Sequence, residues 1–86
     1  MSWTVGFTNK ADKQVGKLPR RERDLLDALV KDLIWRGAIL PDWRNYSKLG
    51  PNLHHCHLSY KWVACWRANS EEIVIYYVGS RENAPY

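Results

Sequence analysis

The sequence lacks the features that a membrane, secreted or multidomain protein needs. Its 86 residues, 45% of them hydrophobic, can fill one small core but are too few for a second domain. No apolar run approaches the roughly 18 residues that cross a bilayer, and the amino terminus lacks the basic start and apolar stretch of a signal peptide. We therefore expect a single domain over residues 1–86 that stays in the cytoplasm and does not enter a membrane.

Cysteine and acidic side chains are also scarce. Cys56 and Cys65 stand in apolar, strand-like sequence, and a reducing compartment would keep both as buried thiols. Asp and Glu are missing from Trp43 to Ser70, a segment that contains Arg44, Lys48, His54, His55, His57, Lys61 and Arg67. The whole chain has a net charge of +4 and a pI near 9.3. A polyanion can lie along an acid-free basic segment without repulsion, so the segment favours nucleic-acid binding.

The hydrophobic pattern of the first half predicts a strand followed by two helices. Residues 2–8 alternate between apolar and polar or small side chains, as in a strand with one buried face. Thr8 or Asn9 can cap a short helix that extends to Leu18. A second helix is predicted from Pro19 to Arg36, because its leucine, valine and isoleucine side chains form one continuous stripe.

The second half predicts a loop and then three strands. Residues 38–51 contain two prolines and two aromatic side chains, so we expect an ordered loop there. Strand-like runs follow at Asn52–Ser59, Lys61–Ala68 and Glu71–Val78, and the turn Ala68-Asn69-Ser70 would join the last two as an antiparallel hairpin. The third run is apolar on both faces, as in a central strand or a strand that keeps an aromatic face for a partner.

This order of elements predicts the fold class. We expect an α+β fold in which two amino-terminal helices pack on one face of a small antiparallel sheet. The other face of the sheet would be open and basic.

Four segments of the chain are similar to a known family. They are Tyr46-Ser47-Lys48-Leu49-Gly50, His55-Cys56-His57-Leu58, Trp62-Val63-Ala64-Cys65-Trp66, and Tyr77-Val78-Gly79 with Ala84-Pro85-Tyr86. The chain resembles, over nearly its whole length, the RelE-like toxins of the RelE/ParE superfamily. The resemblance implies a small sheet with two helices, cleavage of mRNA that is often ribosome-associated, no cofactor, and a cognate antitoxin protein that wraps the toxin.

Metal-free RNA cleavage needs three kinds of group. The ribose 2′-hydroxyl attacks the adjacent phosphate, which calls for a base, an acid for the leaving 5′-oxygen and a cation for the phosphorane. His55 and His57 share one face of a strand, and imidazole exchanges protons near neutral pH. Arg81 follows the last strand and suits a phosphate clamp. With Tyr86, which could assist proton transfer or stack on a base, these are the predicted catalytic residues.

Other residues are predicted to bind the RNA. Arg44, Lys48 and Lys61 suit contacts to the phosphate backbone, because a flexible cation gives charge without fixed geometry. Tyr77 could be a stacking platform for a base. Glu82, the carboxylate near this end of the chain, could orient a histidine, but we prefer the interpretation that it offsets the charge of Arg81.

Three alternatives fit the same residues. Histidines two apart on a strand can chelate a metal ion, but no third ligand is evident, and we predict none. Relatives in the superfamily that inhibit DNA gyrase keep the fold without ribonuclease residues. A decayed toxin would bind RNA or antitoxin without cleavage, and this interpretation draws on a departure from the family: many relatives have arginines where this chain has His55, His57 and Val63.

Overall fold

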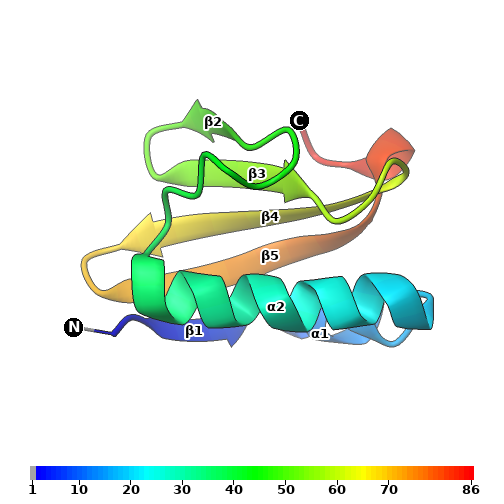
Figure 1. Cartoon of the computed structure of the whole chain (residues 1–86), viewed down its shortest axis with the longest axis horizontal. Coiled ribbons are helices and arrows are strands. Elements are labelled where there is room, and N and C mark those ends of the chain that lie inside the picture. The colour runs from blue at the N-terminus through cyan, green and yellow to red at the C-terminus, as the bar shows by residue number, and fades with distance from the viewer. Residues whose placement is uncertain (1) are drawn as a thin grey trace.

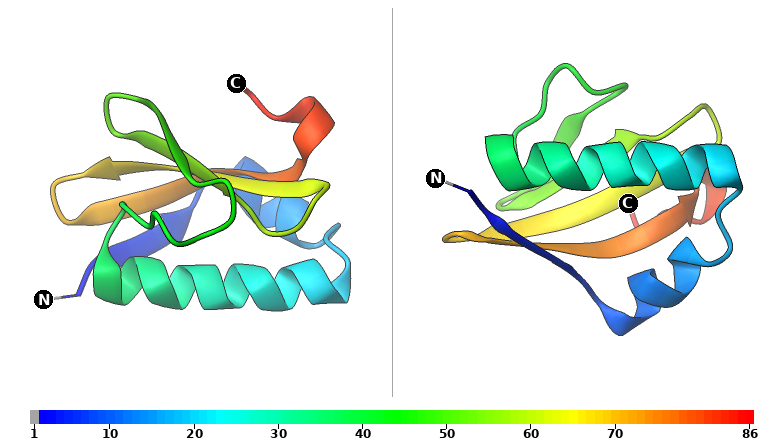
Figure 2. Two further views of the ribbon diagram at one scale, coloured as in Figure 1. Left: turned by 45° about the horizontal axis from the view of Figure 1, so that its top comes forward. Right: turned by 60° about the horizontal axis from the view of Figure 1, so that its bottom comes forward.

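Both helices lie against one face of a mixed β-sheet, and the other face carries none (Figures 1 and 2). A computed structural model describes residues 2–86. The elements in these residues are β1 (Thr4–Phe7), α1 (Asn9–Val15), α2 (Arg20–Arg36), β2 (Ser47–Gly50), β3 (Leu53–His57), β4 (Trp62–Asn69), β5 (Glu72–Ser80) and a 3₁₀ turn, η1 (Arg81–Asn83). No helix in this part of the chain is both long and apolar enough to span a membrane.

The strands lie in the order β1-β5-β4-β3-β2. The strand β5 therefore lies between β1 and β4, which confirms its prediction as a central strand. The prediction of an antiparallel sheet holds from β2 to β5, whereas β1 runs parallel to β5. The parallel pair forms because α1 and α2 carry the chain away from the end of β1, so the chain is free to return in the same direction.

The helices begin close to where the sequence predicted. Of the two candidate caps, Thr8 caps α1, and its hydroxyl accepts a hydrogen bond from the Ala11 amide at 3.1 Å. Pro19 precedes the first residue of α2, and Gly37 follows the last. The side chain of Gln14 in α1 accepts a bond from the Val78 amide at 2.9 Å, just beyond the point where β1 stops pairing with β5.

One strand was missed in the predicted loop 38–51. Residues Ser47–Gly50 form β2, an edge strand that pairs with β3 through Ser47 opposite His55 and Lys48 opposite His54. The strand is short and ends next to Pro51, and such edge strands give a weak alternation signal. The omission affects the candidate site, because Ser47 of β2 contacts His55.

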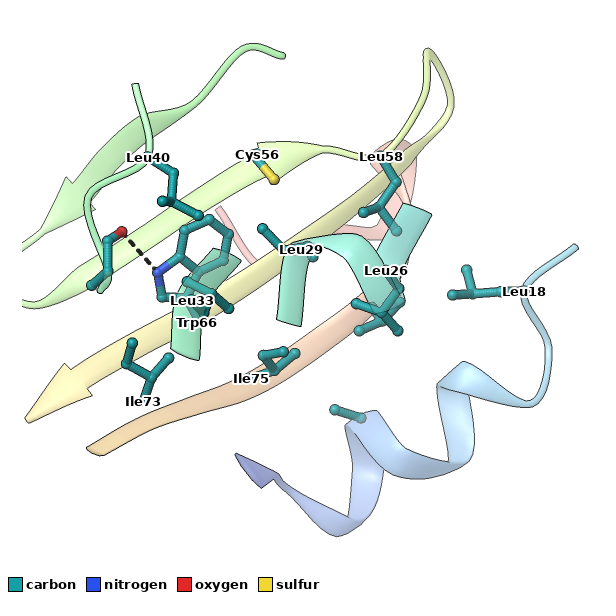
Figure 3. Close-up of a cluster of buried hydrophobic side chains, with 14 residues drawn as sticks. Leu18, Leu26, Leu29, Leu33, Leu40, Cys56, Leu58, Trp66, Ile73 and Ile75 are labelled. Carbon is teal, nitrogen blue, oxygen red and sulfur yellow. Dashed lines mark hydrogen bonds between the residues drawn. The ribbon is translucent and has the colours of Figure 1, made fainter. Parts of the chain in front are cut away.

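The hydrophobic core lies between the helices and the sheet (Figure 3). Leu26, Leu29 and Leu33 of α2 are buried against Trp66 of β4, whose indole N–H donates to the Ala38 carbonyl at 3.1 Å. Cys56 of β3 is also in this core, while Cys65 of β4 is buried on the opposite face. Both cysteines are buried free thiols, as predicted.

Gly37 is predicted to be the most sensitive glycine. Its φ is +90°, and a Cβ there would lie 2.8 Å from Nε1 of Trp3, so Gly37→Ala combines backbone strain with a clash. We expect a loss of about 1–3 kcal/mol in the free energy of unfolding, measured by urea denaturation. Gly6→Ala is the control, because nothing lies within 4 Å of the Cβ that it would add. Equal effects of the two substitutions would show that neither the positive φ nor the contact with Trp3 makes Gly37 special.

Candidate functional site

The candidate site lies on the face of the sheet that has no helix. Because Cys56 points into the core, the side chains of His55 and His57 project from the opposite face of β3, as the alternation of the strand predicted. The two imidazole rings are neighbours, with centroids 5.8 Å apart. The expectation that this face is open needs correction, since His55 and His57 are only 7% and 8% exposed.

The carboxy-terminal tail covers part of the site. After β5, the turn η1 leads the tail back over the helix-free face, as the red end of the chain shows in Figures 1 and 2. The ring of Tyr86 lies 4.5 Å from the ring of His55, centroid to centroid. The structure thus brings together three of the four predicted catalytic side chains, His55, His57 and Tyr86.

Two polar residues that the sequence patterns did not single out contact the imidazoles. The Ser47 hydroxyl lies 3.0 Å from Nδ1 of His55, and the side-chain amide nitrogen of Asn45 lies 3.5 Å from Nδ1 of His57. Asn45 has a φ of 52°, in the left-handed region. Both contacts depend on the path of the chain into β2. A prediction of this strand beside β3 would have placed Ser47 opposite His55.

Burial sets the protonation state of the imidazoles. Burial lowers the pKa of His55, and a hydrogen bond with the Ser47 backbone opposes this shift. Burial is also the largest cause that lowers the pKa of His57. The neighbouring His55 and the positive charges of Arg81 and Arg44 lower the pKa of His57 further. Since an unperturbed imidazole titrates near pH 6.5, both rings are neutral at neutral pH.

The pKa of the Tyr86 phenol is shifted in the opposite direction. Burial raises the pKa of Tyr86, and Arg81 opposes this shift. The phenol is therefore protonated at neutral pH and can donate a proton or a hydrogen bond.

Arg81 stands at the start of η1, beside the turn between β3 and β4. Its amide donates to the Lys61 carbonyl at 2.7 Å, and its guanidinium carbon lies 4.7 Å from the centroid of the Tyr60 ring. Its positive charge lowers the pKa of His57 and opposes the rise in the pKa of Tyr86. Glu82, the residue after Arg81, forms no ion pair within residues 2–86, and its interpretation as a charge that offsets Arg81 stays a prediction.

The predicted RNA-binding residues separate into three places. Arg44 and Lys61 lie with His57 along a cleft beside the imidazoles. Lys48 pairs opposite His54 and so projects toward the helix side of the sheet, away from His55 and His57. Tyr77 is on the helix-free face, but it is only 6% exposed and its phenol donates to the Ser80 carbonyl at 2.7 Å. Its ring forms part of the buried floor of the site and leaves little surface for stacking.

The cleft has a volume of about 640 Å³ and opens beside His57. Its walls are the first two turns of α2, the loop before β2, and the turn between β3 and β4. The lining residues are Arg21, Glu22, Leu25, Asp42, Trp43, Arg44, His57, Leu58, Ser59, Tyr60, Lys61 and Trp62. No cluster of three or more His, Cys, Asp or Glu side chains within residues 2–86 could hold a metal ion.

The lowered pKa values of the imidazoles predict how stability changes with pH. Below their ordinary pKa the unfolded chain binds protons that the folded chain excludes, so stability is complete at neutral pH and is lost as the pH falls. We expect the free energy of unfolding to fall between about pH 7.5 and about pH 5.5, the range in which histidine titrates. A variant with both His55→Gln and His57→Gln should show a smaller fall, and an unchanged fall would contradict the assignment.

Comparisons with known proteins agree on the fold. No family model and no curated protein matches the chain. Among solved structures, a chain of the archaeal RelE–RelB complex from Pyrococcus horikoshii OT3 aligns with a TM-score of 0.76 and 15% identity over 98% of this chain and 100% of that chain. A chain of the E. coli DinJ–YafQ toxin–antitoxin complex aligns with a TM-score of 0.81 and 14% identity over 100% of both chains. A chain of the YoeB–YefM complex from Staphylococcus aureus aligns with a TM-score of 0.74 and 13% identity over 94% of this chain and 99% of that chain. The chain therefore has the RelE-like toxin fold that its sequence resemblance implied.

Proposed function

We propose that the chain is the toxin of a type II toxin–antitoxin pair and acts as an mRNA endoribonuclease. One observation carries the proposal: His55, His57 and Tyr86 meet on the helix-free face of a RelE-like fold, and the positive charges of Arg81 and Arg44 lower the pKa of His57. These side chains supply each kind of group that metal-free RNA cleavage requires. The enzyme would act in the cytoplasm on mRNA, in association with the ribosome.

In the proposed mechanism His55 is the general base. When Nδ1–H of His55 donates its hydrogen bond to the Ser47 hydroxyl, Nε2 has no proton and is free to take the proton of the ribose 2′-hydroxyl. The lowered pKa keeps this ring neutral and ready to accept. Asn45 donates to Nδ1 of His57, so His57 carries its proton on Nε2 and is suited to donate toward the phosphate.

The acid and the cation complete the reaction. Tyr86, whose phenol is protonated, can donate its proton to the leaving 5′-oxygen as the bond from that oxygen to phosphorus breaks. Arg81 can clamp the pentacovalent phosphorane through its planar set of donors. Arg44 and Lys61 bind the adjoining phosphates, and Lys48 binds a more distant part of the RNA backbone.

The partner that silences the protein is proposed to be a cognate antitoxin. The solved structures that resemble this chain include toxin–antitoxin complexes. The net charge of +4 favours an acidic partner that would cover the basic site and exclude RNA.

The histidine pair also separates this proposal from the alternatives. A toxin that acts on gyrase has no need of two buried imidazoles held by hydrogen bonds, whereas a ribonuclease does. A protein that only binds RNA or antitoxin would leave RNA intact, so measurements of RNA length and of turnover distinguish binding from cleavage.

The first experiment tests activity and the histidines together. Induction of the chain alone should arrest bacterial growth and create new RNA ends inside coding regions. Because both rings are buried, His55→Asn and His57→Asn are preferred to alanine: asparagine keeps a polar group near Nδ1 and removes Nε2. Each should lower the rate of RNA cleavage about 100- to 10,000-fold, the range for general acid–base catalysis.

The control is His54→Asn. This residue is the same type in the same strand, but its ring stacks on Trp66 on the helix side. It should keep its cleavage rate, with folding of all variants checked by circular dichroism. Unchanged growth and unchanged RNA on induction of the wild type would exclude the toxin proposal, and full activity of both histidine variants would exclude this mechanism.

The second experiment compares two cations. Arg81→Ala removes a group that contacts the phosphorane, so turnover of bound RNA should fall strongly while RNA affinity weakens only modestly. Lys48→Ala removes one backbone contact, so affinity should fall with a shallower salt dependence and turnover of bound RNA should stay the same. Equal losses of affinity, with no change in turnover in either variant, would show that Arg81 only binds RNA.

A further inference from the structure

The cleft beside His57 contains a buried carboxylate that the proposed chemistry does not use. Glu22 in the first turn of α2 is only 7% exposed. Within residues 2–86 its side chain accepts no hydrogen bond and forms no ion pair. Glutamate side chains are rarely this buried unless they are paired, so the position of Glu22 in the cleft calls for an explanation.

Helix capping does not explain Glu22. It is the third residue of α2, the position from which a glutamate usually reaches back to the amide of the capping residue. The capping residue here is Pro19, which has no N–H to donate. The helix dipole favours a negative charge at this end, but an exposed carboxylate would satisfy it equally well.

The carboxylate oxygens still reach solvent. Every fully buried side-chain oxygen or nitrogen in residues 2–86 has a hydrogen-bond partner. The Glu22 oxygens have none, so they cannot be fully buried, and Glu22 lines the cleft. Its acceptor atoms are therefore available to a ligand that enters there.

Aromatic rings and cations surround this acceptor. Trp43, Tyr60 and Trp62 line the cleft, and the Trp43 ring is fixed because its N–H donates to Asp32 at 2.7 Å. Arg21, Arg44 and Lys61 also line it, and none of them forms an ion pair within the described residues 2–86. The other acid of the cleft, Asp42, is bound to Arg36 at 2.6 Å.

We propose that this cleft is a base-binding subsite in which Glu22 selects guanine beside the cleaved phosphate. The proposal rests on the function proposed above, because His57 belongs both to the cleft and to the candidate catalytic site. The aromatic rings that line the cleft offer a base a surface on which to stack, and the cations that line it can receive its phosphate. A nucleotide seated in the cleft would thus place its neighbouring phosphate next to the imidazoles.

The choice of guanine follows from hydrogen-bond chemistry. Its Watson–Crick edge presents N1–H and N2–H side by side, and a carboxylate can accept both. Adenine and cytosine present one amino group next to an unprotonated ring nitrogen that repels the carboxylate. Uracil presents a single N–H between two carbonyl oxygens.

The test measures binding without cleavage. The full chain is titrated with guanosine, inosine, adenosine, cytidine and uridine 5′-monophosphates, and the NMR shifts of the Trp43 and Trp62 indole N–H groups are followed. We expect guanosine monophosphate to bind about 10- to 100-fold more tightly than the others, the discrimination typical of a bidentate contact. Inosine lacks the N2 amino group, so its weaker binding tests the contact in the wild-type protein, without any variant.

Glu22→Gln should reduce the preference for guanine to within about twofold, because the amide no longer accepts two bonds. Glu71→Gln is the matched control: it makes the same change at an exposed position beyond the far end of β4. Equal binding of all five nucleotides, binding of none, or an unchanged preference in Glu22→Gln would overturn the subsite even if the protein cleaves RNA. Selective guanine binding without RNA cleavage would instead support the subsite and reject the proposed enzyme.

Discussion

Burial of Cys56 and Trp66 against the helices fixes the register of β3 on β4, and the site depends on that register. In the observed pairing Cys56 faces Ala64 and His54 faces Trp66, so one side of both strands belongs to the core. A slip of one residue would turn the core side chains to the helix-free face and place His55 under α2. The same alternation that builds the core therefore sets the two candidate catalytic imidazoles side by side on the other face.

The helix-free face combines a small apolar cluster with two buried imidazoles. Val63, Cys65 and Tyr77 form a small buried floor, and the tail brings Tyr86 over His55. Desolvation lowers the pKa values of the imidazoles and raises the pKa of the phenol, so a group suited to accept a proton and a group suited to donate one coexist at neutral pH.

The parts of the fold that the sequence predicted well are those with strong periodicity. The stripe of α2, the alternation before α1 and the central strand β5 each have a pattern that survives in the structure. The weak points were local. The strand β2 is too short for a pattern, and the turn of the final hairpin is Ser70–Glu71, one residue later than the gap between the predicted strands, with Ser70 at a φ of 56°. A bulge in β5 opposite Cys65 and Trp66 explains why that strand is apolar on both faces, since it puts Ile75 on one face and Tyr77 on the other.

The candidate site was only half predictable for the same reason. Spacing alone placed His55 and His57 on one face, but their contacts with Ser47, Asn45 and Tyr86 come from other segments, the edge strand β2, the loop before it and the tail. Lys48 shows the opposite error, because a basic residue in an acid-free segment need not share a face with the site. Glu22 gave no signal at all, since a glutamate in the first turn of a helix is ordinary until the structure shows that it is buried without a partner.

Because Val63 is fully buried, the positive charge near the site comes from residues outside the strands. Val63 lies opposite His57 and is fully buried, so the sheet itself has no room for an arginine at this position. The cations come instead from the segments that flank the sheet, and backbone hydrogen bonds tie each segment down: the His57 amide donates to the Arg44 carbonyl at 2.8 Å, and the Arg81 amide donates to the Lys61 carbonyl at 2.7 Å. These bonds fix the backbone of Arg44 beside His57 and the backbone of Arg81 beside Lys61. The backbone of each flanking arginine is thus anchored by main-chain hydrogen bonds that do not depend on which side chains the strands carry.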